Sequence, residues 1–300
     1  MNALYHDRQA GRIPPFDNVV IETSGLAEPG PILQAFLSEP TLDGLYTVAG
    51  VVAIVDAVYG PGTWDEHEEA VRQVALADTV LISKLDLADG EGREAMLRAE
   101  VARMNPSATV LRTDDPSLSV AELLTHAGFD PATPGADPRA WLKADAFADR
   151  TDHDHTRCDD PDHDQAPGGD HHRGHDHDHE FRDRGIETFV LIRDEPLTRE
   201  AVQFLLDGIS QNLGANLLRV KGLVNVAEEP GRPAVILGVQ HLLHTMSWLD
   251  RWPDEDNRTR IVFITQGVMR ETLAEVIELL DRIAERTSRA RLKAQQGTST

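Results

Sequence analysis

The sequence predicts an α/β protein with a mostly parallel sheet in its first half, followed by a smaller α+β domain. Three observations support this prediction. Short apolar runs alternate with helical patterns over residues 1–135, residues 136–184 offer little that a core could bury, and strand-like segments follow one another within residues 185–287. We therefore expect two domains with these bounds, a disordered His/Asp-rich linker between them, and a polar tail over residues 288–300.

The first dozen residues are typical of the end of a helix, and four strand and helix pairs follow them. The predicted strands are short apolar runs of the kind that a parallel sheet buries, at residues 19–21, 51–55, 79–82 and 110–111. The first helix can begin at Pro29 or Pro31 and ends before Pro40. The other helices are expected at residues 64–76, 91–104 and 119–126. This alternation indicates a parallel sheet that helices cover on both faces.

The second domain has a different order of elements. Residues 186–192 alternate in polarity as a strand does, and Thr198 heads a helix. Further strands are expected at residues 216–226, 234–239 and 260–265. A final helix starts near Arg270, and the sequence after Thr287 is polar enough to predict a frayed tail. Adjacent strands with helices at the ends indicate an α+β domain.

The composition excludes several classes of function. The chain has 51 acidic and 29 basic residues, so its formal charge of −22 should repel nucleic acid and anionic lipid. No apolar run approaches the roughly 18 residues that span a bilayer, so we expect no membrane partner. Cys158 stands alone and cannot form an intramolecular disulfide, and the first residues lack the apolar core of a signal peptide. These features predict a cytoplasmic protein.

The segment from Asp17 to Pro29 runs from a predicted strand into a loop with a carboxylate and a glycine. Glu22 stands where the strand ends, and Ser24-Gly25 supplies the turn. Because open α/β sheets bind ligands at the carboxyl ends of their strands, this loop is typical of a phosphate and magnesium sensor. A polar strand end followed by a helix cap would give the same pattern, so the loop alone does not decide between them.

A second motif follows the strand at residues 79–82. In GTP-binding folds, a sequence N/S/T-K-x-D at a strand end places its carboxylate to accept the two guanine N–H groups, while the lysine stem packs on the base. Ser83, Lys84 and Asp86 match that pattern, so Asp86 would select guanine. The alternative is a helix cap with a solvated lysine. Pairing with the Glu22 loop, one βα unit earlier, favours the nucleotide interpretation.

The linker contains eight of the thirteen histidines of the chain, with aspartates between them. They are His153, His155, His163, His171, His172, His175, His177 and His179. Imidazole suits zinc, nickel and copper, and zinc usually takes four ligands, so roughly one or two ions would fit. The alternative is a solvated low-complexity segment with incidental metal affinity. We expect the tract to gather metal near the site that delivers it.

Other polar or aromatic residues carry weaker signals. Asp17 and Asp56 stand at strand edges and are interpreted as caps rather than ligands. His241 and His244, in an apolar stretch, are interpreted as core histidines, and Trp248 and Trp252 as packing residues. No Ser/His/Asp or Cys/His combination suggests nucleophilic catalysis, so no catalytic residue is predicted.

Taken together, the segments IETSGLAEP, VVAIVDAV, LISKLDL and RVKGLVNV and the His/Asp-rich insert resemble the CobW-type P-loop GTPases. The resemblance covers nearly the whole chain. It implies a P-loop GTPase-type parallel-sheet domain and a CobW C-terminal α+β domain, acting as a GTP-dependent metallochaperone that delivers zinc, or in some members cobalt, to a client metalloprotein. Neither the client nor an oligomeric state follows from it.

The resemblance also implies roles for individual residues. Glu22 matches the acidic residue that coordinates Mg²⁺, Gly25 the switch glycine, and Lys84 and Asp86 the guanine-recognition pair. Ser83 stands where many members have asparagine. Five residues match the pattern of the second domain without an assigned chemistry. They are Arg219, Lys221, Gly222, Gln240 and Trp248.

Two family motifs are missing from the sequence. No G-x-x-x-x-G-K-[ST] loop is present to hold the phosphates, and no C-x-C-C metal motif precedes Cys158. Both would lie upstream of Met1, so we expect an incomplete GTPase domain from a truncated reading frame, with weak or no GTP binding. The second interpretation is a non-enzymatic zinc-binding or storage protein that keeps the GTPase half as a scaffold.

Overall fold

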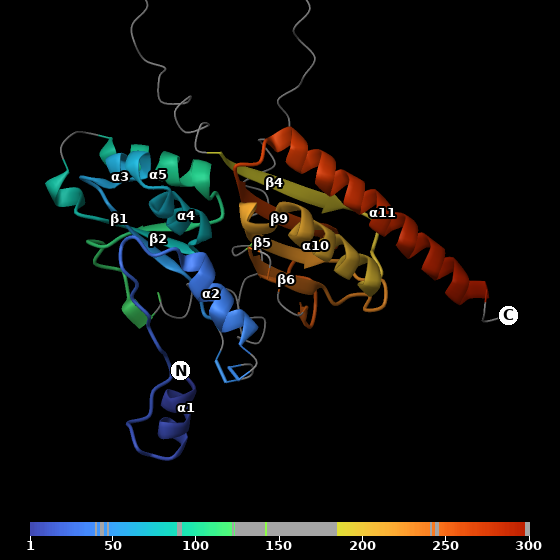
Figure 1. Ribbon diagram of the computed structural model, residues 1–300, viewed down its shortest axis with the longest axis horizontal. Helices are drawn as coiled ribbons and strands as arrows, with labels where there is room; N and C mark the ends of the chain where they lie inside the picture. The colour runs from blue at the N-terminus through green and yellow to red at the C-terminus, as the bar shows by residue number, and fades with distance from the viewer. Residues whose placement is uncertain are drawn as a thin grey trace, which may run out of the picture.

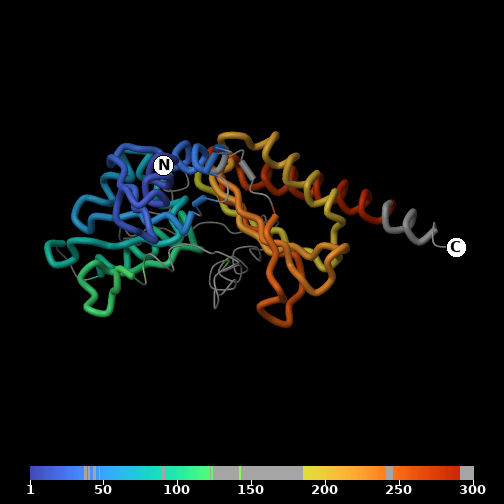
Figure 2. Tube along the Cα trace, turned by 90° about the horizontal axis from the view of Figure 1, so that it is seen from below, coloured from blue at the N-terminus to red at the C-terminus, as the bar shows by residue number. Residues whose placement is uncertain are grey.

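The computed structural model describes residues 1–39, 41–42, 45–46, 48–88, 92–121, 123, 142, 185–240, 242–243 and 246–297. These residues form two sheets that lie side by side, the first in the N-terminal half and the second in the C-terminal half (Figures 1 and 2). The helix at the C-terminal end extends away from the junction between them (Figure 2).

The N-terminal domain is an α/β unit with a three-stranded parallel sheet in the order β1-β2-β3. Its elements are α1 Asn2–Gln9, α2 Pro29–Ser38, β1 Val52–Asp56, α3 Gly60–Glu66, α4 Glu68–Leu76, β2 Thr79–Ser83, η1 Leu85–Leu87, α5 Arg93–Met104 and β3 Thr109–Arg112. The three predicted strands in this list and the helix at Pro29 are confirmed. The helix predicted at residues 119–126 lies largely outside the described residues.

The core of this domain lies between one face of the sheet and helices α3, α4 and α5. Val55, Val80 and Ile82 from the strands pack there against Val74 and Val101 from α4 and α5. The opposite face is not covered by these helices, and Ile54 in the edge strand β1 keeps 68% of its surface exposed. The expectation that helices cover the sheet on both faces is therefore wrong for the described residues.

The predicted strand at residues 19–21 is also not formed. Residues 18–24 have no regular secondary structure, and Val20 and Ile21 are exposed. A strand requires a neighbour for its backbone N–H and C=O groups. Among the described residues this segment pairs with no strand, so its apolar pattern alone does not make it one.

A second difference concerns the helix predicted at residues 64–76. His67 has extended backbone angles, φ −134° and ψ 109°, which end α3 and begin α4. Glu68 and Glu69 then occupy the first turn of α4, where negative charge complements the helix dipole. The single predicted helix is therefore two.

The C-terminal domain is an α+β unit, as predicted, with an antiparallel sheet in the order β4-β9-β5-β6-β7, and β8 also pairs with β6. Its elements are β4 Ile186–Arg193, α10 Arg199–Leu213, η2 Gly214–Asn216, β5 Leu217–Val224, β6 Ala234–Val239, β7 Leu242–Leu243, β8 Ser247–Trp248, β9 Thr259–Gln266 and α11 Arg270–Gly297. Helices α10 and α11 cover one face of this sheet (Figure 1).

The helix side holds the largest hydrophobic core among the described residues. Phe263 and Val220 from the sheet pack there against Leu205 and Ile209 of α10 and Ile277 of α11. Thr198 caps α10 as predicted, because its hydroxyl accepts a hydrogen bond from the Ala201 amide at 3.3 Å.

Helix α11 continues to Gly297, past Thr287, where the sequence predicted a frayed tail. The buried Ser288 explains the continuation, since its hydroxyl accepts a hydrogen bond from the Thr198 amide at 2.8 Å. Arg289 adds an ion pair with Glu285 one turn earlier. The polar residues at this point hold the helix against α10 instead of ending it.

Candidate functional site at the carboxyl edge of the parallel sheet

The carboxyl ends of β1 and β2 bring the predicted guanine motif beside a carboxylate. In the parallel register Asp56 lies opposite Ser83, so the residues that follow both strands meet at one edge of the sheet. The Ser83 hydroxyl donates to the Val55 carbonyl at 3.2 Å, which holds the start of the motif against β1. This edge is where open α/β sheets bind ligands.

Lys84 has an unusual backbone at this edge. Its φ of 59° and ψ of 31° place it in the left-handed region, where a non-glycine residue is uncommon. Its ammonium Nζ lies 2.5 Å from Asp56 Oδ2. The short helix η1 follows at once and carries Asp86, whose side chain is exposed. The turn therefore fixes the Lys84 stem and leaves the Asp86 carboxylate open to a ligand.

Asp56 both caps its turn, as predicted, and binds Lys84. Its Oδ1 accepts hydrogen bonds from the Val58 amide at 2.8 Å and the Tyr59 amide at 3.2 Å. Burial by itself raises the pKa of Asp56, but the hydrogen bonds from Lys84 and the two amides outweigh it, so that pKa lies below its usual value. The hydrogen bond to Asp56 in turn raises the pKa of Lys84. Both groups are charged at neutral pH.

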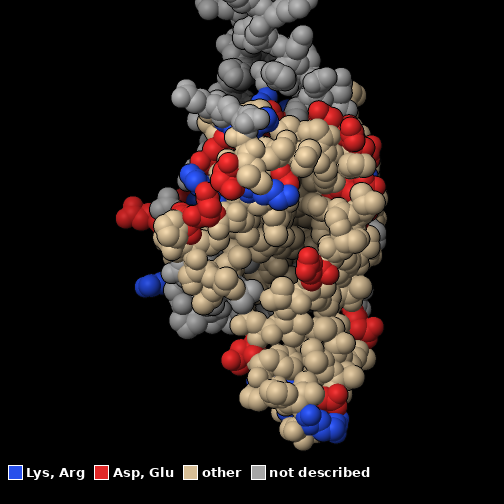
Figure 3. Space-filling model, turned by 90° about the vertical axis from the view of Figure 1, so that its left-hand side faces the viewer, with Lys and Arg blue, Asp and Glu red and all other residues tan. Residues whose placement is uncertain are grey.

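The end of β3 adds charges that neutralise one another. Arg112 donates two hydrogen bonds to Asp114, at 2.9 and 2.8 Å, and a third to Glu94 at 3.2 Å. The bonds between them raise the pKa of Arg112 and lower that of Asp114. On the face that Figure 3 shows, charged side chains group at the upper end and at the lower tip, with a few acidic ones between them on a largely uncharged surface.

The loop that carries Glu22 and Gly25 is held by α4 rather than by a strand. The Gln73 side-chain amide donates to the Gly25 and Ala27 carbonyls, each at 2.9 Å. The Ala27 amide donates to the Ser24 carbonyl at 2.9 Å and closes a turn. Glu22 itself is exposed and does not end a strand, so its predicted place at the strand's carboxyl end is wrong. Sequence reasoning gave no role to Gln73.

Two residues of the C-terminal pattern, Arg219 and Lys221, reach into the N-terminal domain. Arg219 donates to the Leu76 carbonyl at the end of α4 and to Asp78 Oδ1, and Lys221 Nζ lies 3.0 Å from the same oxygen. The other oxygen of Asp78 accepts from the Val51 amide at 3.0 Å. Arg219 and Lys221 therefore form an ion-pair junction with Asp78 that joins the two sheets. Two charges at alternate positions of an apolar strand were the sequence signal for it.

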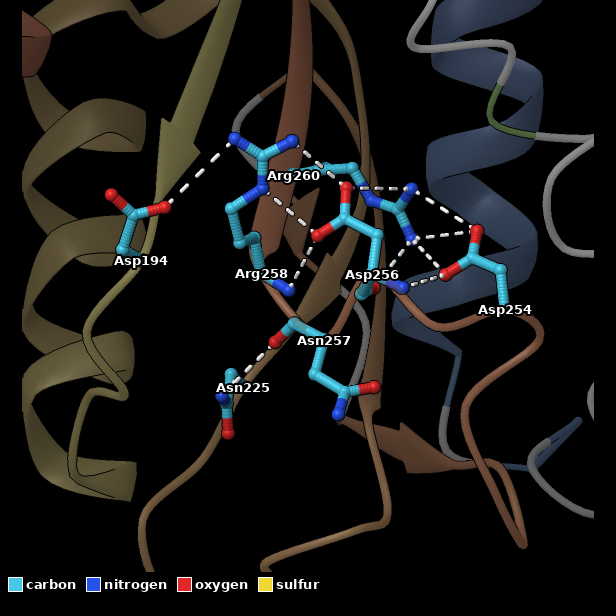
Figure 4. Close-up of polar contacts among 7 residues, drawn as sticks. All are labelled: Asp194, Asn225, Asp254, Asp256, Asn257, Arg258 and Arg260. Atoms are coloured by element: carbon cyan, nitrogen blue, oxygen red, sulfur yellow. Dashed lines mark hydrogen bonds and ion pairs between the residues drawn. The ribbon is translucent and has the colours of Figure 1, made fainter.

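A second network lies at the start of β9 and is structural (Figure 4). Arg258 forms two hydrogen bonds to Asp256, at 2.9 and 3.0 Å, and Arg260 binds Asp254 at 3.3 Å. Asn225 donates to the Asn257 carbonyl at 3.0 Å. Every carboxylate in this network faces an arginine, so it fastens the loop before β9 and does not form a metal site.

The structure does not describe the predicted metal ligands of the histidine tract. All eight histidines of the tract, with Cys158, His241 and His244, lie outside the described residues. Within the part of the chain that the structure describes, no three His, Cys, Asp or Glu side chains are arranged to hold a metal ion. Trp248 and Trp252 pack against the two sides of the C-terminal sheet, as predicted, and Arg199 stacks on Trp248.

Comparison with known proteins matches the part of the chain around each sheet to a family of domains. Residues 1–112 match the family model of the CobW/HypB/UreG nucleotide-binding domain, and residues 186–280 match that of the cobalamin synthesis protein cobW C-terminal domain. The two matches together cover more than half of the chain. The chain belongs to the CobW family. This confirms the resemblance that the sequence motifs indicated, and it places the Ser83 to Asp86 edge in the nucleotide-binding domain of this CobW-type protein.

Several relatives are similar to this CobW-type chain. The zinc chaperone YjiA of Escherichia coli is 28% identical over 251 residues, 83% of this chain, and the zinc chaperone CobW of Pseudomonas aeruginosa is 30% identical over 287 residues, 86% of this chain. The chain spans 66% and 65% of their lengths, just under two thirds. A solved structure of Zn(II)-bound YjiA GTPase from E. coli matches with a TM-score of 0.64 at 26% identity, covering 92% of this chain and 74% of that one.

Proposed function

We propose that this chain is a zinc metallochaperone whose nucleotide-binding domain responds to GTP with Mg²⁺ and whose histidine tract holds the metal for a client metalloprotein. The single observation that carries the nucleotide part is the Asp56–Lys84 pair, which fixes the guanine motif at the carboxyl edge of the sheet with Asp86 open. Two relatives that bear the name zinc chaperone support the metal part.

The residues at this edge fit a guanine base. The exposed Asp86 carboxylate would accept the two guanine N–H groups, and the Lys84 stem would lie along the base because Asp56 holds its ammonium. Glu22 would coordinate Mg²⁺ in the loop that Gln73 anchors, and Gly25 would let that loop move. In the proposed reaction, GTP hydrolysis would supply the free energy for transfer of the metal to the client protein.

This chain offers fewer contacts to the phosphates of GTP than to its guanine base. The 300 residues contain no G-x-x-x-x-G-K-[ST] segment, whose backbone amides and lysine would cradle the phosphates. We therefore propose that this chain selects guanine but binds GTP weakly, so that it responds only to millimolar nucleotide.

The metal belongs to the tract of eight histidines between the two domains. Neutral imidazoles are good ligands for zinc, and cobalt is a second candidate for the same donors. Among the described residues no three His, Cys, Asp or Glu side chains are grouped to hold a metal ion, and the tract is our candidate store for zinc. None of the helices in the described part of the chain is long and apolar enough to cross a membrane. We place the protein in the cytoplasm, where it would meet its client.

Zinc release tests this function directly. The zinc-loaded chain is mixed with a fluorescent zinc indicator as acceptor, together with Mg²⁺ and millimolar GTP or ATP. We expect GTP, and not ATP, to change the rate of transfer, because Asp86 distinguishes the bases. Equal rates with GTP, with ATP and without nucleotide would contradict the nucleotide part of the proposal.

A non-enzymatic zinc-binding protein is the second candidate. It is favoured by the exposed, strand-free segment at residues 18–24 and by the missing phosphate loop. In that case the tract would bind zinc as before, and the parallel sheet would serve as a scaffold. GTP turnover distinguishes the two candidates, because only the first predicts inorganic phosphate release above the background.

A further inference from the structure

We propose that Arg72 is a positioning residue that links the loop of Glu22 and Gly25 to the C-terminal domain. Helix α4 lies between that loop and the end of β9, and the half-buried Arg72 side chain contacts both. The inference rests on the proposed function, because the link has a task only if the loop senses nucleotide. Through Arg72, a change in the conformation of the loop would reach the C-terminal domain directly.

The first half of the link is within the N-terminal domain. Arg72 Nη1 donates to Glu28 Oε1 at the end of the loop, and Nη2 lies 3.4 Å from Glu68 Oε2 one turn earlier on α4. The next residue, Gln73, holds the Gly25 and Ala27 carbonyls. Two consecutive residues of one helix therefore fix three points of the loop.

The second half crosses to the C-terminal domain. Arg72 Nε donates to Gln266 Oε1 at 2.5 Å, and Gln266 is the last residue of β9. The three nitrogens of the guanidinium thus serve three different partners. Because the guanidinium is planar and its donors point in fixed directions, it sets the relative position of the Glu28 carboxylate and the Gln266 amide while both contacts are made.

A second contact between the same parts follows directly after the loop. Helix α2 begins at Pro29, and a Cβ atom on Gly30 would lie 2.7 Å from Gln240 Nε2 in the C-terminal domain. Leu33 of α2 packs beside Leu218 and Ile264 of the antiparallel sheet. A shift of the loop would therefore reach the C-terminal sheet both through Arg72 and through α2.

The Arg72 link and the Asp78–Arg219 ion pair differ in burial, and this suggests a division of roles. The Arg72 and Glu28 side chains keep 31% and 33% of their surface exposed, so water can replace their contact at small cost. Arg219 and Asp78 keep 5% and 8% of their side-chain surface exposed, and breaking that pair would leave the buried Arg219 charge without its carboxylate. The buried pair holds the domains together, while the Arg72 contact can open and close as the loop moves.

Backbone dynamics of the full chain, measured by NMR without nucleotide or zinc, test the link. We compare Gln266→Ala, Arg72→Gln and Arg72→Lys with the wild type. Gln203→Ala is the matched control in the same domain, because Gln203 binds Asp207 on the exposed side of α10. The readout is the heteronuclear NOE of Gly25, Leu26 and Ala27, together with the Gln73 side-chain amide signals.

We expect Gln266→Ala to lower the heteronuclear NOE of the loop, although the change lies in the other domain, and Gln203→Ala to leave it unchanged. Arg72→Lys keeps a charge for Glu28 but lacks the planar donors, so it should behave as Gln266→Ala does, and Arg72→Gln should have the largest effect. An unchanged loop in Gln266→Ala, or an equal change in Gln203→Ala, would overturn the link. Since no ligand is present, failure of the zinc or GTP assays leaves this result standing.

Discussion

Asp78 and Arg219 form a buried ion pair that joins the parallel sheet to the antiparallel sheet. Arg219 donates to Asp78 Oδ1, and Lys221 binds the same carboxylate oxygen at 3.0 Å. Burial by itself raises the pKa of Asp78, but the charges of Arg219 and Lys221 outweigh it, so that pKa lies below its ordinary value. One carboxylate therefore compensates two buried cations at the junction.

Removing this carboxylate should destabilise the whole chain. Asp78→Asn would remove the buried carboxylate that Arg219 and Lys221 share, and we expect it to lower the free energy of unfolding by about 3 kcal/mol. Urea denaturation followed by circular dichroism measures the change. Asp250→Asn is the control, because that carboxylate is fully exposed and 4.0 Å from Arg232. A loss no larger than the control's would contradict the role of Asp78.

The Asp78–Arg219 pair also predicts how the free energy of unfolding depends on pH. The pKa of Asp78 is lower in the folded state than in the unfolded state, so its contribution is fully present above the unfolded pKa of about 3.9. It is lost as the pH falls below that value towards the folded pKa. Wild type should therefore lose more stability than Asp78→Asn between neutral pH and acid below about pH 4. Parallel curves for the two proteins would contradict this account.

The exposed Asp86 at the carboxyl edge of the parallel sheet predicts how a substitution would change the preference between nucleoside bases. Asp86→Asn removes the charged acceptor for the guanine N–H groups, and we expect the preference for guanosine over adenosine to fall about tenfold. NMR titration of the Leu85 to Leu87 amides with each nucleoside measures the preference without any contribution from phosphate. The exposed Asp250→Asn again serves as the control. If Asp86→Asn keeps the wild-type preference, Asp86 does not read the base.

The missing phosphate loop predicts weak affinity for the whole nucleotide. We expect isothermal titration of the 300-residue chain with GTP and Mg²⁺ to show no submicromolar binding, since the base contacts have no cradle for the phosphates. GDP and guanosine should bind about as weakly as GTP. Submicromolar GTP binding would show that other residues hold the phosphates.

Much of the fold follows from local sequence. Strands β1 and β2 lie within a residue of their predicted bounds, because a short apolar run between turn residues has few alternatives to a buried parallel strand. The segment at residues 19–21 has the same apolar character but no strand beside it among the described residues. Whether such a run becomes a strand depends on a neighbour, which a local pattern does not specify.

The candidate site was predictable in part for a similar reason. The motif at Ser83, Lys84 and Asp86 was visible from its spacing, and the structure confirms its place after a strand. Its partner Asp56 lies 28 positions earlier in the sequence, and Asp78 and Arg219 are 141 positions apart. Such pairs are set by the register and packing of sheets, so only the structure shows them.

The zinc stoichiometry of the chain tests the central claim most directly. Equilibrium dialysis against buffered zinc compares the full chain with a variant in which residues 153–179, which hold all eight histidines of the tract, are deleted. We predict that the wild type binds roughly one or two ions, by the four-ligand rule for zinc. The deletion should lose this zinc while keeping the wild-type circular dichroism spectrum. Unchanged zinc stoichiometry in the folded deletion variant would contradict the assignment of the metal to the histidine tract.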